Sequence, residues 1–244
     1  MKVVYEDNHV IIVAKESGEI VQGDKTGDKP LSEIVKEYIK EKYQKPGEVF
    51  LGVVHRLDRP VSGLVVFART SKALARLNKM FAEGEVHKTY WAITQTLPHP
   101  LPAEGGEHTS SHPSLNREGS GEGLLTHWLV RNEKQNKSYA YDREVPHSKK
   151  AQLRYRVIGQ GDRYTLLEVE LLTGRHHQIR CQLAKVGMSI KGDLKYGAPR
   201  SNPDGSISLL SRRVEFIHPV SKQQIIVEAP VPADNLWQAL APKE

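Results

Sequence analysis

Asp58 is the carboxylate whose neighbours in the sequence are best suited to chemistry. It lies in the run His-Arg-Leu-Asp-Arg-Pro, so that Arg56 and Arg59 flank it. Nearby positive charge favours the ionised form of a carboxyl group, and an ionised, positioned carboxylate can act as a nucleophile. The alternative is an aspartate that caps a turn and pairs with an arginine. For an isolated pattern of this kind, that alternative is the more common case.

Two apolar segments flank this aspartate and are expected to hold it in place. The first covers residues 49–54 and the second residues 64–67, and both are expected to be buried strands. Pro60 and Gly63 break the chain between them. The pattern therefore predicts a rigid corner that carries the carboxylate.

A second polar constellation occupies residues 171–180, Leu-Leu-Thr-Gly-Arg-His-His-Gln-Ile-Arg. We expect a strand to end at Gly174 and a helix to run from about Arg175 to Val186. That helix would carry two cations, Arg175 and Arg180, near its N-terminus, which is the end that attracts anions. Two solvated arginines on a surface helix are an equal alternative.

The neighbouring histidines His176 and His177 raise the question of a metal site. Adjacent residues of a helix point in different directions, and the sequence has no HExxH pattern and no second His/Cys pair. We therefore expect no metal. The single cysteine, Cys181, excludes an internal disulfide and a Cys-rich zinc site, and it fits a reducing compartment.

Composition narrows the class of protein. The chain has 244 residues, of which 38% are hydrophobic, so it can build a sizeable core. Its net charge of +6 suits a polyanionic partner without requiring one. The N-terminus lacks the apolar run of a signal peptide, and no stretch is suited to span a bilayer. We expect a cytoplasmic protein with no membrane partner.

Strand patterns outnumber helical ones and do not alternate regularly with them. This predicts an α+β fold on a mixed, mainly antiparallel central sheet flanked by helices. Strands are expected over 3–5, 10–14, 86–93, 152–158, 164–172, 208–211, 214–217 and 225–229, and helices over 31–39, from Ser71 to Gly84, and over 234–240.

Two polar segments interrupt these patterns. Residues 98–123 are rich in Pro, Gly, Ser, His and Glu, and we expect them to form a flexible insertion. Residues 132–150 are a second polar excursion. Residues 1–244 are expected to form a single domain that contains these segments.

The motifs together resemble the RluA family of RNA pseudouridine synthases. His-Arg-Leu-Asp followed by Ser-Gly and an apolar strand is similar to one family signature, and residues 171–180 are similar to another, Leu-x-Thr-Gly-Arg-x-His-Gln-Ile-Arg. Residues 15–18 and 88–92 resemble the Lys-Pro-Ser-Gly and Lys-x-Tyr-x-Ala segments. Residues 187–197 resemble a Gly-Asp-x-x-Tyr-Gly segment, which we interpret as turn chemistry. The resemblance covers nearly the whole chain.

The resemblance implies roles for five residues. Asp58 is the catalytic residue, either as a nucleophile or as a base acting at the sugar, and Arg180 pairs with it. Tyr90 stacks on the target base, Ile179 is an apolar wall of the base pocket, and Arg56 fills the vacated space or holds the flipped nucleotide.

The implied reaction breaks the N-glycosidic bond of a uridine and rejoins the ring through carbon. The enzyme must flip the base out of its stack and bind the RNA in a cleft. No cofactor and no metal are needed, the partner is ribosomal or transfer RNA, and the protein is expected to be a monomer. Family members often carry an N-terminal S4 domain, for which the position of Asp58 leaves no room.

Two other functions are compatible with parts of the sequence. A glycoside hydrolase also acts on a glycosidic bond, but it needs two carboxylates, and no partner for Asp58 is evident. A non-catalytic RNA-binding or RNA-chaperone protein would need neither Asp58 nor Arg180.

Overall fold

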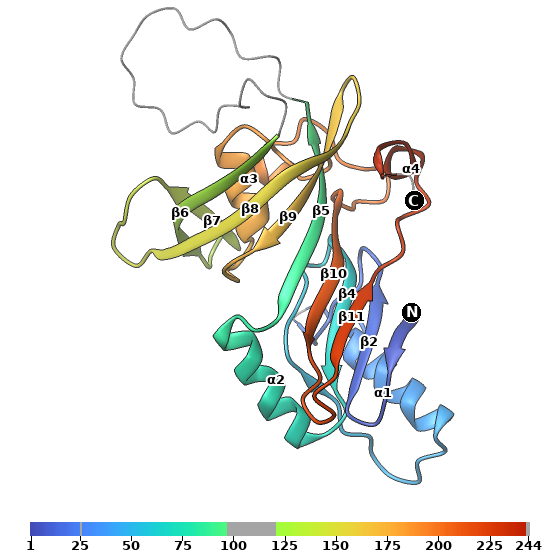
Figure 1. Cartoon of the computed structure of the whole chain (residues 1–244). Coiled ribbons are helices and arrows are strands. Elements are labelled where there is room, and N and C mark those ends of the chain that lie inside the picture. Colours follow the sequence, from blue (N-terminus) through green and yellow to red (C-terminus); the bar gives the residue numbers. More distant parts are fainter. Residues whose placement is uncertain (25, 97–120, 243–244) are drawn as a thin grey trace, which may run out of the picture. The chain divides into compact units, whose positions relative to one another are not determined.

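A computed structural model describes residues 1–24, 26–96 and 121–242. The chain forms two compact units. The first comprises Met1–Thr89 and Leu210–Pro230, and the second Tyr90–Leu209 and Val231–Glu244. The chain passes from the first unit to the second within β5 (His87–Gln95) and returns within β10 (Leu209–Ile217), as the colours of Figure 1 allow the reader to follow.

The strands of the first unit follow the order β1-β2-β4-β10-β11, and β3 also pairs with β4. All pairs in this series are antiparallel except β4 and β10, which run parallel with Ser62 opposite Leu210. The strand bounds are Lys2–Glu6 for β1, Val10–Lys15 for β2, Gly52–Val53 for β3, Ser62–Ala68 for β4 and Gln224–Glu228 for β11.

Local chemistry explains the turns and caps of this unit. The carboxylate of Asp7 accepts backbone N–H groups of His9 and Val10 at 2.7 and 2.8 Å, which closes the predicted turn between β1 and β2. Helix α1 (Leu31–Lys42) covers the predicted range. Helix α2 (Ser71–Glu83) is capped by the Thr70 hydroxyl rather than by Ser71.

The strands of the second unit follow the order β5-β9-β8-β6-β7, with β9, β8, β6 and β7 antiparallel. Helix α3 (Gln178–Lys185) packs on one face of this sheet, where Cys181 joins a buried cluster with Leu129, Ala151 and Tyr196. The bounds are Glu122–Asn132 for β6, Lys137–Tyr141 for β7, Lys149–Gln160 for β8, Tyr164–Leu171 for β9, Gln178–Lys185 for α3, Leu194–Tyr196 for the 3-10 helix η1 and Asn235–Leu240 for α4.

The predicted α+β class with a mixed, mainly antiparallel arrangement is confirmed. Three local predictions are wrong. Only Gly52–Val53 of the apolar run 49–54 is a strand, because it meets just the last residues of β4, and Phe50 is 47% exposed. The two short strands predicted around 208–217 form one strand, β10.

The third correction concerns the polar excursion predicted over 132–150. Strand β7 and the start of β8 lie within it, and β7 is polar because it is the last strand in its unit and turns one face to solvent. Of the insertion predicted over 98–123, residues 98–120 lie outside the described residues, and Glu122 and Gly123 belong to β6. None of the described helices is long and apolar enough to cross a membrane.

Candidate active site

Asp58 lies on a tight turn between β3 and β4, as predicted. The backbone N–H of Val61 donates to the carbonyl of Asp58 at 3.0 Å and closes the turn. Strand β4 begins at Ser62, and its second residue, Gly63, has a φ of +112°. Gly63 also lies so close to Ser211 that there is no room for a side chain, because an added Cβ would lie 2.3 Å from the Ser211 carbonyl oxygen. The glycine therefore fixes where the corner ends.

The buried side chain of Lys15 binds the backbone of this corner. It is the last residue of β2, its side chain is only 1% exposed, and its ammonium donates to the carbonyls of Glu16, Arg59 and Val61 at 2.9, 3.0 and 2.6 Å. An ammonium has three donors, and all three are used. The lysine thus fixes the backbone on the C-terminal side of Asp58.

The ammonium of Lys15 and the carboxylate of Asp58 also interact electrostatically. Burial lowers the pKa of Lys15 to about 8, and the negative charges of Glu19 and Asp58 act in the opposite direction. A buried cation thus interacts with the predicted catalytic carboxylate. The sequence motif predicts only a turn for the Lys15 segment.

We expect Lys15→Met to destabilise the protein and lower turnover. Three carbonyls would lose their hydrogen-bond donor, which destabilises the folded state. Because the ammonium would no longer have to be buried, part of this loss is recovered, and we expect the free energy of unfolding to fall by about 2 kcal/mol. Urea unfolding and turnover at saturating RNA measure the two effects. Lys36→Met removes a partly exposed lysine of α1 that pairs with Glu33, and it should change neither quantity. Unchanged stability in Lys15→Met would contradict the role given to these hydrogen bonds.

The two arginines of the motif do not flank the carboxylate as predicted. Arg59 extends toward another loop, where its guanidinium donates to Asp28 at 2.6 Å and to Thr26 at 2.9 Å. Arg56 is exposed and makes no hydrogen bond or ion pair with any residue that the structure describes. Arg56 is therefore available to contact a ligand.

His55 fastens the other end of the same loop to the sheet. Its Nε2 accepts the backbone N–H of Val66 in β4 at 2.9 Å, so this nitrogen carries no proton, and its ring stacks on Phe81 with centroids 4.9 Å apart. Burial, and to a smaller extent the charge of Lys88, lowers the pKa of His55 to about 3. The loop around Asp58 is thus fixed by a neutral histidine as well as by Lys15.

This neutral histidine predicts a dependence of stability on acid pH. Because the pKa of His55 is lower in the folded chain than its usual value of about 6.5, the unfolded chain binds more protons between about pH 6.5 and 3. The free energy of unfolding should therefore fall on acidification in that window, by up to about 1.4 kcal/mol per pH unit. His55→Gln, which keeps an acceptor but does not titrate, should flatten this slope in urea unfolding. The control is His87→Gln, which changes an exposed histidine. If the free energy of unfolding depended on pH equally in His55→Gln and His87→Gln, the prediction would be wrong.

Three predicted site residues belong to the second unit, and all are buried. Tyr90 lies in β5, and Ile179 and Arg180 lie in the first turn of α3. The guanidinium of Arg180, 5% exposed, donates from Nε and Nη2 to the two carboxylate oxygens of Asp193 at 2.7 and 2.9 Å. This two-pronged bond fixes the plane of the guanidinium.

Asp193 is the functional residue that sequence reasoning missed in this unit. Its side chain is 1% exposed, and its backbone carbonyl accepts the N–H of Tyr196 at 3.0 Å at the start of η1. Residues 187–197 had been interpreted as turn chemistry alone. The turn is present, and it also supplies the counter-ion of Arg180.

The predicted start of α3 is wrong, whereas one of the two cations expected there, Arg180, does bind a carboxylate, that of Asp193. The helix begins at Gln178, whose side-chain oxygen accepts the Thr173 hydroxyl at 2.8 Å and the Arg175 N–H at 2.9 Å. Arg175 itself donates to the Lys150 carbonyl at 3.1 Å. The Gln178 side chain thus bonds the loop that precedes the helix, and Arg180 is a buried residue rather than a solvated one.

The two histidines are also arranged differently from the prediction. They precede α3, with φ of +51° at His177, and their rings stack with centroids 3.8 Å apart. The helical argument against a shared metal is therefore wrong. Within residues 1–24, 26–96 and 121–242, no three His, Cys, Asp or Glu side chains are grouped so as to hold a metal ion.

The predicted site residues thus fall into two sets. Arg56 and Asp58 belong to the first unit, and Tyr90, Ile179 and Arg180 belong to the second. The backbone around Asp58 is held by Lys15 and His55, and Arg180 is held by Asp193, whereas the Arg56 side chain is exposed. The pairing of Asp58 with Arg180 and the contacts of Tyr90 and Ile179 with a base stay predictions.

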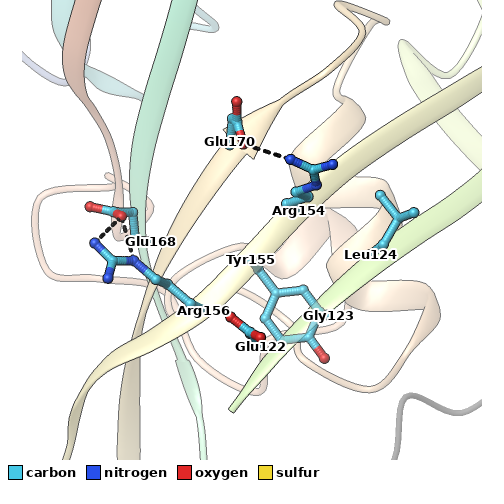
Figure 2. A pocket seen from close by; sticks show the side chains of 8 residues that line it. All are labelled: Glu122, Gly123, Leu124, Arg154, Tyr155, Arg156, Glu168 and Glu170. Carbon is cyan, nitrogen blue, oxygen red and sulfur yellow. Dashed lines mark hydrogen bonds and ion pairs between the residues drawn. The ribbon is translucent and has the colours of Figure 1, made fainter. Parts of the chain in front are cut away.

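A pocket of the second unit contains none of these residues. Figure 2 shows that two ion pairs cross it, between Arg156 and Glu168 at 2.6 Å and between Arg154 and Glu170 at 3.9 Å. Because its arginines already have carboxylate partners, the pocket is poorly suited to bind an anion. It is lined by Glu122, Gly123, Leu124, Arg154, Tyr155, Arg156, Glu168 and Glu170.

Comparison with known proteins identifies the class of enzyme. Residues 9–185 match the family model for RNA pseudouridylate synthases. The chain belongs to this family, and the resemblance found in its motifs is confirmed. It is therefore an isomerase that converts uridine in RNA to pseudouridine.

Individual relatives span nearly all of the chain. The mitochondrial pseudouridylate synthase RPUSD4 of Xenopus tropicalis is 31% identical over 96% of this chain and 73% of its own length. The tRNA pseudouridine synthase C of Vibrio vulnificus is 29% identical over 98% of this chain and 94% of its own. The solved structure of human RNA pseudouridylate synthase domain containing 4 has the same fold, with a TM-score of 0.71 at 20% identity over 95% of this chain and 89% of that one. Neither a glycoside hydrolase nor a non-catalytic RNA-binding protein is favoured.

Proposed function

We propose that Asp58 carries out the isomerisation on a uridine that has been flipped out of a folded ribosomal or transfer RNA. The observation that carries this proposal is the corner itself. Lys15 and His55 hold the loop around Asp58 on both sides through three hydrogen bonds, and none of the three uses the Asp58 side chain. Such a preorganised carboxylate suits catalysis better than an ordinary turn cap.

The reaction replaces the bond between C1′ of the ribose and N1 of uracil by a bond between C1′ and C5. The proton lost from C5 balances the one that N1 gains, so no group is imported and no electron is transferred. The proposal therefore includes neither a cofactor nor a metal. Asp58 acts either as a nucleophile or as a base at the sugar.

The remaining predicted residues complete this proposal. The buried ring of Tyr90 provides a face on which the uracil stacks, and Ile179 provides an apolar wall, as is usual for flipped bases. Arg180, oriented by Asp193, directs its guanidinium to Asp58. Arg56, which is exposed, fills the space that the base leaves or holds the flipped nucleotide.

Relatives whose names refer to both classes of RNA support the choice of substrate. One is named tRNA pseudouridine synthase C, and others are named ribosomal large subunit pseudouridine synthases C and D. Mapping pseudouridines in total RNA from cells that lack this protein tests the proposal. We expect at least one uridine of tRNA or rRNA to lose its modification, and to regain it with the wild-type gene but not with Asp58→Asn. Modification that stays complete in the deleted strain, or that Asp58→Asn restores, would refute the proposal.

A further inference from the structure

Lys88 is a half-buried cation without a counter-ion. It is the second residue of β5, and its ammonium lies 5.3 Å from the centre of the Phe81 ring. Among the residues that the structure describes, it forms no hydrogen bond and no ion pair. Burial lowers the pKa of Lys88, so the fold itself disfavours the charge that this lysine carries.

Three other lysines of the first unit differ from Lys88, because each has a hydrogen-bond acceptor or a carboxylate beside its ammonium. Lys15, which is buried more completely, donates to three carbonyls. Lys29 and Lys42 lie near the surface and pair with Glu37 and Glu6 at 2.5 and 2.6 Å. A lysine that is partly desolvated and has only an aromatic ring beside it lacks the compensation that these have.

The position of Lys88 connects it with the loop of Asp58. His55 stacks on the same Phe81 ring, and the charge of Lys88 is one of the two causes that lower the pKa of His55. His55 is followed directly by Arg56, the exposed cation that has no partner among the described residues. Two cations without a counter-ion among the described residues are therefore associated with His55: Lys88 contacts the same Phe81 ring, and Arg56 follows His55 directly in the chain.

We propose that Lys88, together with Arg56, binds a phosphate group of the RNA backbone next to the target uridine. This inference rests on the proposed function. Flipping a nucleotide requires its flanking backbone to be held, and phosphate contacts provide that positioning. Lysine binds phosphate as a point charge. The Lys88 ammonium retains some contact with solvent, because it does not belong to the fully buried polar atoms that lack a hydrogen-bond partner. A ligand can therefore reach it.

The test measures RNA binding and folding for Lys88→Met, which keeps the apolar stem on Phe81 but removes the charge. Equilibrium binding is measured with a substrate stem-loop at several salt concentrations, in an Asp58→Asn background so that no turnover intervenes. We expect affinity to fall about tenfold and the slope of log Kd against log salt to decrease by about one phosphate contact. The melting temperature should not decrease, because the lost charge was uncompensated. Lys88→Arg should retain most of the affinity.

The matched control is Lys79→Met in α2, which removes an exposed lysine that pairs with Glu83 at 3.8 Å. It should leave affinity, salt slope and melting temperature unchanged. If Lys88→Met binds RNA with wild-type affinity and salt slope, or if it melts at a clearly lower temperature, the lysine is structural and the inference is wrong. Pseudouridine formation by the wild-type protein on the same stem-loop is measured in parallel. Its absence would count against the proposed function, whereas wild-type turnover with unaltered binding by Lys88→Met counts against Lys88 alone.

Discussion

Turnover falls by about a thousandfold or more when Asp58 is replaced by asparagine, if this carboxylate is the catalytic group. The substitution keeps the shape of the side chain and removes only its negative charge. The corner should persist, because the hydrogen bonds that hold it come from Lys15, His55 and the backbone of Val61. Melting temperature and RNA affinity should therefore remain close to those of the wild type. Single-turnover pseudouridine formation on a stem-loop measures the loss.

The control for this experiment is Asp28→Asn. Asp28 is exposed and pairs with Arg59, the neighbour of Asp58, so it tests a nearby loss of charge outside the predicted site. Its turnover should stay within about twofold of the wild type, as expected for an exposed ion pair. A loss below about tenfold for Asp58→Asn corresponds to less than about 1.4 kcal/mol of barrier. That result would remove Asp58 from its assigned role.

The second large effect is expected for Arg180→Lys. Lysine keeps the charge but cannot form the two parallel bonds that Arg180 makes with Asp193. We expect turnover to fall by about a hundredfold or more, since the guanidinium plane that is predicted to orient Asp58 is lost. RNA affinity should change much less. Weak binding with full turnover at saturating RNA would instead make Arg180 a phosphate contact.

Because Arg180 is part of a buried ion pair, this variant needs a control for folding. Asp193→Asn keeps the arginine and neutralises its partner, and leaving one member of a buried pair uncompensated costs about 3–5 kcal/mol. Asp193→Asn should therefore lose at least as much stability as Arg180→Lys while it keeps more of the turnover. If turnover in both variants simply followed their loss of stability in urea unfolding, Arg180 would have a structural role only.

The elements that were predicted correctly are those whose signals are local. Helix α1 shows apolar residues at helical spacing, the β1–β2 turn has an aspartate that bonds its own backbone, and the corner at Asp58 is marked by proline and glycine. Each of these signals arises from the chemistry of a few neighbouring residues. The motifs also predicted the protein family, and the comparisons with known proteins confirm that prediction.

The features that could not be predicted depend on residues far apart in the chain. The partner of Arg180 is Asp193, beyond the end of α3, and the donors that fix the loop of Asp58 come from Lys15 in β2. Arg59 was expected beside Asp58 because it is adjacent in sequence, yet its side chain reaches Asp28. One signal was available for Lys15, since it ends a strand of apolar residues that leaves no room for an ordinary solvated lysine.

The parallel pairing of β4 with β10 has a consequence for how the enzyme is made. Gly63 meets Ser211, so the first unit combines the start of the chain with a segment near its end. On the ribosome, a nascent chain that stops short of β10 leaves this edge of β4 without its neighbour, and unpaired strand edges promote aggregation. The corner that carries Asp58 can therefore be completed only after most of the protein has been synthesised. Prematurely terminated products should be inactive and should depend on chaperones.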